Sequence, residues 1–567
     1  MPSRNQCQYQ HWWDVRRSRD HPTLQRPNNE TAFILPLPSF PPALDFDPDR
    51  FTLPPAYEEI EDLEKAIHHI RLPSKCFTDA LPFSQLAYGD DKTVLHVKST
   101  CRSLQQLPRL PTRIFRYVRF TIFTVYRRLF TIVFLLNLFG LYILVRQHQW
   151  RSRGWTGSLS TLATLASSNF LLAILVRQDY LVNLLYRTAW LVPWSFPLSV
   201  RKIMARVYCY GGIHSGAAVA GTLWWTIFTA VMSWTLFQEK ACASTGVFVA
   251  WTSLILLLAI LILAYPTMRA RYHNTFETMH RFLGWASILL FWAQLFLLTA
   301  STSTQSTHFP TNLIRNPTFW NLMLITTLLI YPWLRLRCWT FTAHVLSSHA
   351  VRLSFPYTVH KFSCLSISSS PLREWHPFAT FPSTNPENPG ASMVISDAGD
   401  WTRSVIRTAQ RKPAVMKAYR TEGYETTSEG IEMRFYVKSH PKAGVLSLSL
   451  LFPRVLILTT GSGIGPALSS LLERPQGQHA RLIWSTRSPL MTYGANLLAL
   501  VDKADSNAIV IDTDEMGRPD LLEVAWRVGR EQRVEAVFVL SNEKVVKWVV
   551  GGLERRGMPA YGPIWDS

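Results

Sequence analysis

Six apolar stretches in the middle of the 567-residue chain constrain its fold more than any other feature. A helix needs roughly 20 mostly apolar residues to cross a hydrocarbon core of about 30 Å, and each stretch approaches that length. They cover residues 129–145, 155–176, 211–237, 247–265, 282–299 and 319–336. The chain is therefore predicted to be a multi-domain membrane protein with a six-helix transmembrane bundle over residues 127–338.

Basic residues are distributed unevenly around these stretches. They gather before the first, between the second and third, between the fourth and fifth, and after the sixth, with Arg128, Arg206 and Arg281 as examples. Cytoplasmic flanks carry such an excess, so both termini are predicted to lie in the cytosol. The amphipathic stretch 178–200, broken by prolines, is expected to lie along the inner face of the bilayer.

The formal net charge of +20 has the same origin. Anionic lipid head groups are the natural partners of basic residues beside membrane helices. A nucleic-acid partner is not expected, because no basic run interleaved with aromatic residues occurs in the soluble parts of the sequence. Seven scattered cysteines without a CxxC pair argue against a disulfide framework and against a zinc or iron–sulfur site.

The first 126 residues are predicted to form a partly disordered cytosolic leader. Residues 34–58 are rich in proline, and the start of the sequence does not resemble a signal peptide. The run Pro54-Pro55-Ala56-Tyr57 matches the PPxY pattern that WW domains bind in the polyproline II form. A WW-domain partner is therefore one hypothesis for the leader.

The sequence changes in character after the last apolar stretch. Short β-rich runs separated by Pro and Gly, such as 351–354 and 362–367, predict a small β-barrel over residues 340–450. From residue 451 to 567, apolar strands alternate with helical patterns, which predicts an α/β domain with a parallel sheet. The expected strands of that sheet cover residues 455–459, 481–485, 508–512 and 536–540.

A glycine-rich turn follows the first of these parallel strands directly. It contains Gly461, Gly463, Gly465 and Pro466, and a helical pattern follows. Glycines let the backbone approach a pyrophosphate, which the free amides and the dipole of the helix N-terminus then hold. Strand, turn and helix together predict a dinucleotide site. The alternative is a tight turn with a purely structural role, which would show the same sequence pattern.

The end of the second parallel strand carries residues suited to a nucleotide phosphate. The run Trp484-Ser485-Thr486-Arg487 ends this strand, and Tyr493 follows six residues later. In nucleotide folds of this kind a hydroxyl and an arginine can bind the ribose 2′-phosphate, with a tyrosine against the adenine. This pattern favours NADPH over NADH, and the alternative is a solvated turn.

Two motifs upstream carry a family resemblance. The run HPFAT begins at His376, and ISDAGDWT begins at Ile395. They are similar to the flavin domain of the ferredoxin-reductase-like family found in ferric reductases and NADPH oxidases, where the HPF segment lies against the isoalloxazine and a GDWT strand follows. The resemblance implies an FAD site formed by His376, Pro377, Phe378, Thr380, Trp401 and Thr402.

The chain departs from that family at three places. Ser396 stands where the family has an arginine that contacts the FAD diphosphate, and the Gly-Pro-aromatic-Gly segment before the nucleotide strand is missing. Ser541 replaces the cysteine that the family keeps close to the nicotinamide. The resemblance also implies that Trp565, in the terminal GPIW run, stacks on the flavin.

Two histidines in the apolar region are predicted to bind haem iron. Such a site needs two neutral imidazoles from separate helices. His214 lies early in the third apolar stretch, and His280 opens the fifth. Both would then start at the cytosolic face and lie at the same depth, as the inner haem pair of ferric-reductase-like domains does. The alternative is that each is an ordinary polar residue at a helix end.

A second haem is not expected. Family members with two haems carry further histidines thirteen or fourteen residues later, roughly 20 Å along the helices. Those positions hold Ile227, Phe228, Ala293 and Gln294, none of which binds haem iron. The sequence therefore predicts at most one haem b in this bundle.

From about residue 110 onward the chain resembles the TmpA-type fungal integral-membrane flavoproteins, a divergent branch of the ferric-reductase/NADPH-oxidase superfamily. The resemblance implies an oxidoreductase that passes electrons from NADPH through FAD to one haem and on to ferric iron, oxygen or a small metabolite. The alternative is a membrane signalling or scaffold protein on a degenerate reductase fold, which the missing arginine, cysteine and histidines favour.

Overall fold

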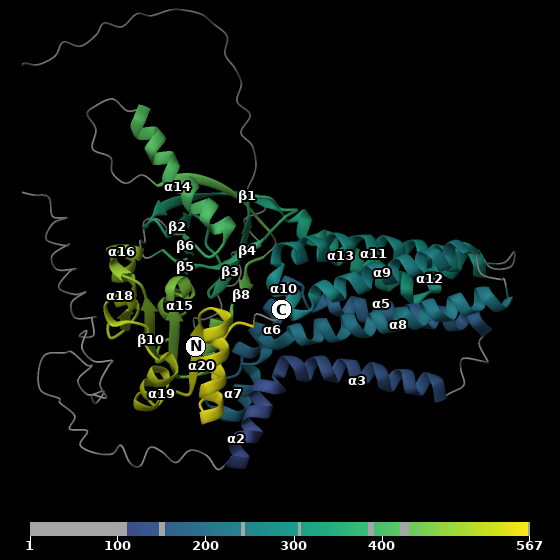
Figure 1. The fold of residues 1–567 in the computed structure, drawn as a ribbon, viewed down its shortest axis with the longest axis horizontal. Coiled ribbons are helices and arrows are strands. Elements are labelled where there is room, and N and C mark those ends of the chain that lie inside the picture. Colours follow the sequence, from purple (N-terminus) through teal and green to yellow (C-terminus); the bar gives the residue numbers. More distant parts are fainter. Residues whose placement is uncertain are drawn as a thin grey trace, which may run out of the picture. The chain divides into compact units, whose positions relative to one another are not determined.

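The computed structural model describes residues 110–146, 154–239, 244–303, 308–383, 390–419, 430–438 and 440–564 (Figure 1). The proline-rich stretch 34–58, with its PPxY run, and Trp565 lie outside the described residues.

Each predicted apolar stretch forms one helix. These helices are α3 Val125–Arg146, α5 Gly154–Leu175, α8 Gly211–Glu239, α9 Ser244–Ala264, α11 His273–Thr302 and α13 Pro317–Leu334. Within the described residues, five helices are long and apolar enough to cross a membrane, and α13 is not among them. Its polar residues and the internal Pro332 make it less apolar. Shorter helices flank these six, namely α2 Leu110–Tyr117, η4 Val118–Ile122, α10 Pro266–Arg271 and α12 Phe309–Arg315.

Small residues bring the long helices close together. A Cβ on Gly212 would overlap the carbonyl oxygen of Tyr126 on α3, and one on Gly216 would lie 2.8 Å from the carbonyl oxygen of Phe130. Backbones that approach this closely are typical of helix packing in membranes. Figure 1 shows α5, α8, α9, α11 and α13 running alongside one another.

The amphipathic stretch forms α6 Asp179–Trp190 and α7 Leu198–Met204, followed by the short helix η5 Val207–Tyr210. Its apolar face is covered by protein, because Val182, Tyr186 and Ala189 are buried in a core shared with the parallel sheet. The location of this stretch along the inner face of the bilayer stays a prediction. Periodicity identified the apolar face but not what would cover it.

The barrel region forms an antiparallel sheet in the order β4-β3-β7-β1-β2-β6-β5, with β8 paired to β3. Its two edge strands, β4 and β5, are separated by Thr380 alone, so the sheet must curl until its edges nearly meet. The strands are β1 Arg337–Val345, β2 Ala350–Phe355, β3 Ser363–Ser368, β4 His376–Ala379, β5 Phe381–Pro382, β6 Ala391–Ser396, β7 Ile431–Val437 and β8 Lys442–Ala443.

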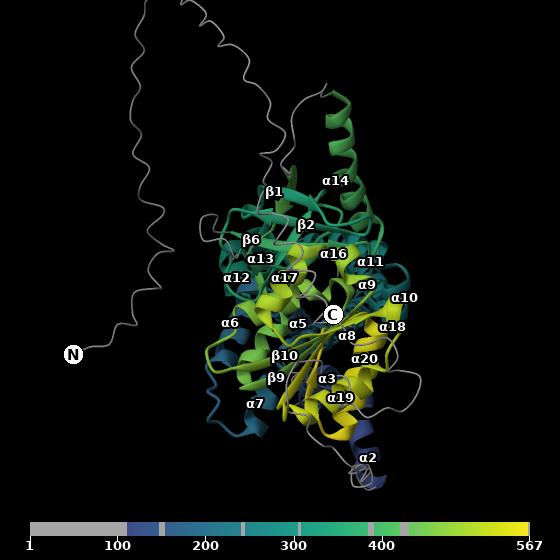
Figure 2. The same ribbon diagram turned by 90° about the vertical axis from the view of Figure 1, so that its left-hand side faces the viewer.

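The GDWT run is not a strand. Strand β6 ends at Ser396, and helix α14, Asp400–Tyr419, begins inside the motif. The Thr402 hydroxyl accepts hydrogen bonds from the amides of Ala398 and Gly399, at 2.9 and 3.0 Å, and so satisfies donors just before the helix. Figure 2 shows α14 projecting beyond the strands of this sheet.

The last part of the chain forms a parallel sheet, as predicted. Its strand order is β11-β10-β9-β12-β13. One face packs on α15 and α17 and the other on α19 and α20, which buries both faces (Figure 2). The strands are β9 Arg454–Thr460, β10 His479–Thr486, β11 Ile509–Asp512, β12 Ala536–Leu540 and β13 Ala560–Tyr561. The helices are η6 Val445–Leu451, η7 Gly461–Gly463, α15 Ile464–Leu472, α16 Pro489–Tyr493, α17 Ala495–Ala504, α18 Thr513–Met516, α19 Leu521–Glu531 and α20 Glu543–Arg556.

Candidate functional site

The glycine-rich turn lies where the strand order of the parallel sheet reverses. Strand β9 has β10 on one side and β12 on the other, and ligands of such sheets bind outside the carboxyl ends of the strands at this switch point. Gly461 has φ +52°, which favours glycine. A Cβ on Gly463 would overlap the Thr459 hydroxyl, so this turn depends on glycine at both positions.

The third glycine of the turn faces the antiparallel sheet. A Cβ on Gly465 would lie 3.7 Å from the Cβ of Val394 on β6. Pro466 lies in the first turn of α15, where its missing N–H removes no helical hydrogen bond. The N-terminus of α15 is therefore held directly against the strand that leads to Ser396.

Ser541 lies beside the glycine-rich turn. Its Oγ is 2.6 Å from the Oγ of Thr460 at the end of β9. Asn542, the next residue, caps α20 by accepting a hydrogen bond from the amide of Val545. Two hydroxyls thus meet at the switch point, where a polar group of a ligand can replace one partner.

Tyr493, on the short helix α16 that follows strand β10, lies close to the glycine-rich turn. The rings of Trp484 and Tyr493 are 5.1 Å apart, and the Trp484 indole N–H donates to the carbonyl oxygen of Gly461 at 2.9 Å. Burial raises the pKa of Tyr493, partly offset by the hydroxyls of Ser396 and Thr486. Tyr493 is 3% exposed, so it supports the turn from inside the domain.

Arg487 has a neighbour that sequence reasoning missed. Its side chain is 75% exposed, and its Nε lies 3.8 Å from the Asp514 carboxylate. Asp514 also accepts a hydrogen bond from the Ser488 hydroxyl at 2.9 Å. An arginine favours a ribose 2′-phosphate, whereas a carboxylate at such a position favours a 2′-hydroxyl, so the two side chains compete in nucleotide selection.

The HPF strand and the GDWT helix form one aromatic cluster. The His376 ring stacks on Trp401 at 4.1 Å, and the Phe378 ring lies 6.0 Å from Trp401. Burial lowers the pKa of His376, which Glu374, 3.5 Å away, partly offsets. Pro377 is exposed at the middle of the strand. The structure therefore brings together the aromatic residues of both motifs.

The two threonines of these motifs have protein partners. Thr380 is buried, and its hydroxyl donates to the Ser363 carbonyl oxygen at 3.1 Å. The Thr402 hydroxyl is engaged at the start of α14. Either hydroxyl would need to exchange these bonds to contact a flavin.

The structure brings the two predicted haem ligands together. The ring centres of His214 on α8 and His280 on α11 are 6.3 Å apart. Two metal–nitrogen bonds of about 2 Å, with about 1 Å from each nitrogen to its ring centre, span roughly 6 Å. His214 Nδ1 lies 2.8 Å from the carbonyl oxygen of Ala173, which leaves its Nε2 free. His280 Nδ1 is buried without a hydrogen-bond partner. These residues fit an iron held between two imidazoles.

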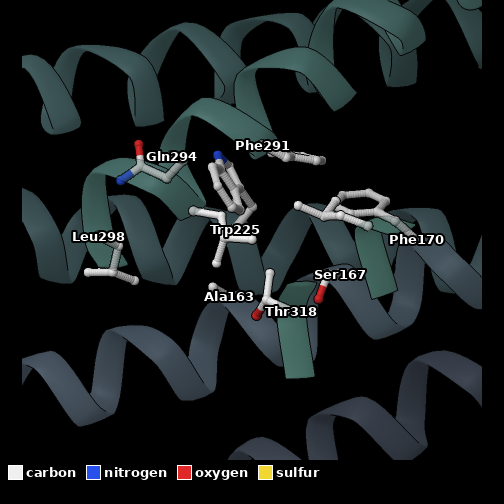
Figure 3. Close-up of a pocket in the computed structure, with 10 residues that line it drawn as sticks. Ala163, Ser167, Phe170, Trp225, Phe291, Gln294, Leu298 and Thr318 are labelled. Atoms are coloured by element: carbon white, nitrogen blue, oxygen red, sulfur yellow. The ribbon is translucent and has the colours of Figure 1, made fainter. Parts of the chain in front are cut away.

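The level where a second haem would lie is packed with side chains. Phe228 is 0% exposed and Gln294 is 2% exposed. Gln294 lines a cavity of about 20 Å³, enough for a water molecule. Figure 3 shows Trp225, Phe291, Phe170 and Gln294 around it. The limit of one haem stays a prediction.

A side chain on the helix of His280 contacts the turn that precedes the HPF strand. Arg281 donates from Nη1 to the carbonyl oxygens of Leu372 and Arg373, the latter at 3.2 Å. Its Nη2 lies 3.8 Å from Glu277, one helical turn away. No sequence signal pointed to this contact, which joins residues 91 positions apart.

A second contact holds the same turn against α13. The Lys438 ammonium lies 5.6 Å from the Trp333 ring and 5.5 Å from the Trp375 ring. Burial lowers the pKa of Lys438 to about 8. The turn 369–375 is therefore held against α11 by Arg281 and linked to α13 through Lys438.

Comparison with known proteins finds sequence similarity to reductases. Residues 445–567 match the family described as adenylate-forming reductase 03009, C-terminal domain. The adenylate-forming reductases 03009 and 06235 of Coprinopsis cinerea are 35% and 36% identical to this chain over 78% of its length. The chain spans 40% of the length of each of these relatives.

More distant similarities point to two other proteins. NADPH oxidase 1 of Rattus norvegicus is 26% identical over 221 residues, which cover 36% of this chain and 33% of that protein. A solved ferredoxin NADP+ reductase from Neisseria gonorrhoeae, with bound FAD and NADP, covers 41% of this chain and 99% of its own, with 14% identity and a TM-score of 0.28.

Proposed function

We propose that this chain is a membrane oxidoreductase that carries electrons from NADPH, by way of FAD and one haem, to an acceptor such as ferric iron, oxygen or a small metabolite. In this proposal the long helices span the bilayer with both termini in the cytosol, and the chain is a TmpA-type member of the ferric-reductase/NADPH-oxidase superfamily. The similarity to reductases and to NADPH oxidase 1 supports it.

One observation carries the proposal: the three candidate sites adjoin one another. The glycine-rich turn contacts Val394, on the strand that leads to Ser396. The HPF strand follows the turn 369–375, which Arg281 contacts, and Arg281 directly follows His280. This order suits electron transfer from a nucleotide through a flavin to a haem.

In this proposal each group of residues binds a different part of the cofactors. When bound, flavin supplies the conversion of a two-electron hydride donor into single-electron steps, and haem iron takes up one electron at a time. The glycine-rich turn and the α15 N-terminus would hold a diphosphate. His376 and Phe378, backed by Trp401, would hold the flavin ring, and His214 and His280 would bind the iron.

An absorption spectrum of the purified protein tests this proposal, because flavin and haem bands are separately visible. We expect both bands after reconstitution with FAD and haem, and we expect both to change when NADPH is added without oxygen. A wild-type protein that binds neither cofactor would instead support the signalling or scaffold alternative. The observation that favours this alternative is Ser396, which stands where the resembling family has its diphosphate arginine.

NADPH preference should depend on Arg487. Its guanidinium is permanently charged and can pair bidentately with a phosphate that NADH lacks. We expect Arg487→Ala to raise the apparent KM for NADPH roughly ten- to hundredfold and to change that for NADH little. Asp514→Ala is the matched change, because it removes the competing carboxylate and should strengthen the NADPH preference. Equal effects of Arg487→Ala on both nucleotides would mean that the residue only supports its loop.

Arg281 should set the rate at which electrons reach the haem. Removing its two hydrogen bonds frees the turn 369–375 from the helix of His280. We expect Arg281→Ala to slow haem reduction about tenfold or more in anaerobic stopped-flow, while flavin reduction by NADPH is unchanged. Amide hydrogens of the turn should also exchange faster. Arg271→Ala, an exposed change at the last residue of α10, is the control. Loss of the haem bands instead would assign Arg281 to haem binding.

A further inference from the structure

Arg352 lies on the antiparallel sheet next to both flavin motifs. It belongs to β2 and pairs in register with Val394 of β6 and with His344 of β1. Its guanidinium lies 5.5 Å from the ring of Phe381, the residue after Thr380. The side chain is therefore on the face of the sheet that carries the end of the HPFAT run.

This arginine has no compensating negative charge among the described residues. Its Nε is buried without a hydrogen-bond partner, and burial is the cause that lowers its pKa. The groups around it are Phe381, Val394 and His344, and burial lowers the pKa of His344, with Arg352 contributing. The side chain is half-buried, and taking an unpaired charge out of water costs free energy. A ligand of opposite charge would supply the missing partner.

The surroundings of Arg352 indicate what that ligand is. Val394, its neighbour in register, is the residue that packs against Gly465 of the glycine-rich turn. Two residues further along the same face of β6 stands Ser396, whose hydroxyl lies beside that of the buried Tyr493. A cation and a hydroxyl thus lie where the sheet meets the N-terminus of α15, which itself favours anions.

We infer that Arg352 binds the diphosphate group of a dinucleotide and replaces the arginine that the resembling family carries at the position of Ser396. This inference rests on the proposed function and adds the residue that supplies the charge. The guanidinium fork matches two phosphate oxygens, and the Ser396 hydroxyl can donate a further hydrogen bond. The diphosphate can come from FAD or from NADPH, and the two sources are separable by experiment.

The test compares Arg352→Ala and Arg352→Lys with wild type in full-length protein. We expect Arg352→Ala to weaken FAD binding roughly ten- to hundredfold, measured by flavin fluorescence, and to leave FMN binding unchanged because FMN has no diphosphate. Arg352→Lys should recover part of the affinity as a point charge. A raised KM for NADPH with unchanged FAD affinity would assign the diphosphate to NADPH. Unchanged binding of both would overturn the inference.

A stability measurement separates this inference from a merely structural role. Removing a half-buried charge that has no ion-pair partner should leave the ligand-free protein as stable as wild type or more stable, while the rise in Tm on adding FAD is lost. A lower Tm without ligand would show that Arg352 supports the fold instead. Arg434→Ala, an exposed change on β7 of the same sheet, should alter neither measurement.

The proposed function can fail independently of this site. If wild type does not bind FAD, the oxidoreductase proposal fails, and inorganic pyrophosphate and ADP then probe Arg352 directly. Binding of either by wild type and its loss in Arg352→Ala would still support an anion site. Absence of binding in both proteins would overturn the inference.

Discussion

Replacing either His214 or His280 with alanine is expected to abolish the haem absorption bands of the purified protein. The two ring centres lie 6.3 Å apart on separate helices, and a haem that depends on two imidazoles would seldom be retained with one. Wild type should show one low-spin b-type haem per chain by pyridine haemochrome assay, with neither variant exceeding about a tenth of that content.

His273→Ala provides the control for this experiment. His273 is exposed at the first residue of α11, seven positions before His280, and its replacement should leave the spectrum intact. A haem-to-protein ratio near two would show that other ligands exist, against the packing around Phe228 and Gln294. A ratio near zero with flavin present would leave a membrane-tethered NADPH–flavin reductase.

The long helices and the parallel strands could be predicted because they depend on local pattern. Apolar length alone located α8 and α11, and an apolar run followed by glycines located β9 and its turn. The pairing of His214 with His280 followed from helix alternation, which puts both at one depth. Each of these inferences needs only the order of residues along the chain.

The GDWT segment was predicted wrongly because the resemblance outweighed a local signal. Asp400, the second residue of the run and the first of α14, is acidic, and acidic residues are enriched in the first turn of helices. The Thr402 hydroxyl then bonds to the preceding amides, as hydroxyls do at helix starts. These cues indicate a helix start, which the structure contains.

Contacts between distant segments could not be read from the sequence. Nothing in the sequence around Arg281 shows that its hydrogen-bond partners are carbonyl oxygens of a turn 91 residues away. In the sequence, Arg352 looks like any other basic residue in a strand. Only the structure shows that its Nε is buried without a hydrogen-bond partner. Likewise, the apolar face of α6 is evident from periodicity, but its cover, the parallel-sheet domain, is a matter of tertiary packing.

The double variant His376→Ala with Phe378→Ala is expected to release the flavin. Both rings contact Trp401, at 4.1 and 6.0 Å, so removing them takes away two of the three aromatic groups in the cluster. Aromatic contacts contribute about 0.5–1.5 kcal/mol each beyond the area they bury, so FAD affinity should fall roughly ten- to hundredfold. Flavin content after gel filtration and the dissociation constant from fluorescence measure the loss.

The matched control for the double variant is Tyr436→Ala, which removes a 39% exposed aromatic ring from β7 of the same sheet and should leave flavin content unchanged. Retention of full affinity in the double variant would mean that the flavin binds elsewhere, because a ring resting on this cluster cannot lose two of its three contacts without effect. If wild type holds no flavin even in excess FAD, the cluster only packs the start of α14. The sheet would then serve the scaffold role rather than electron transfer.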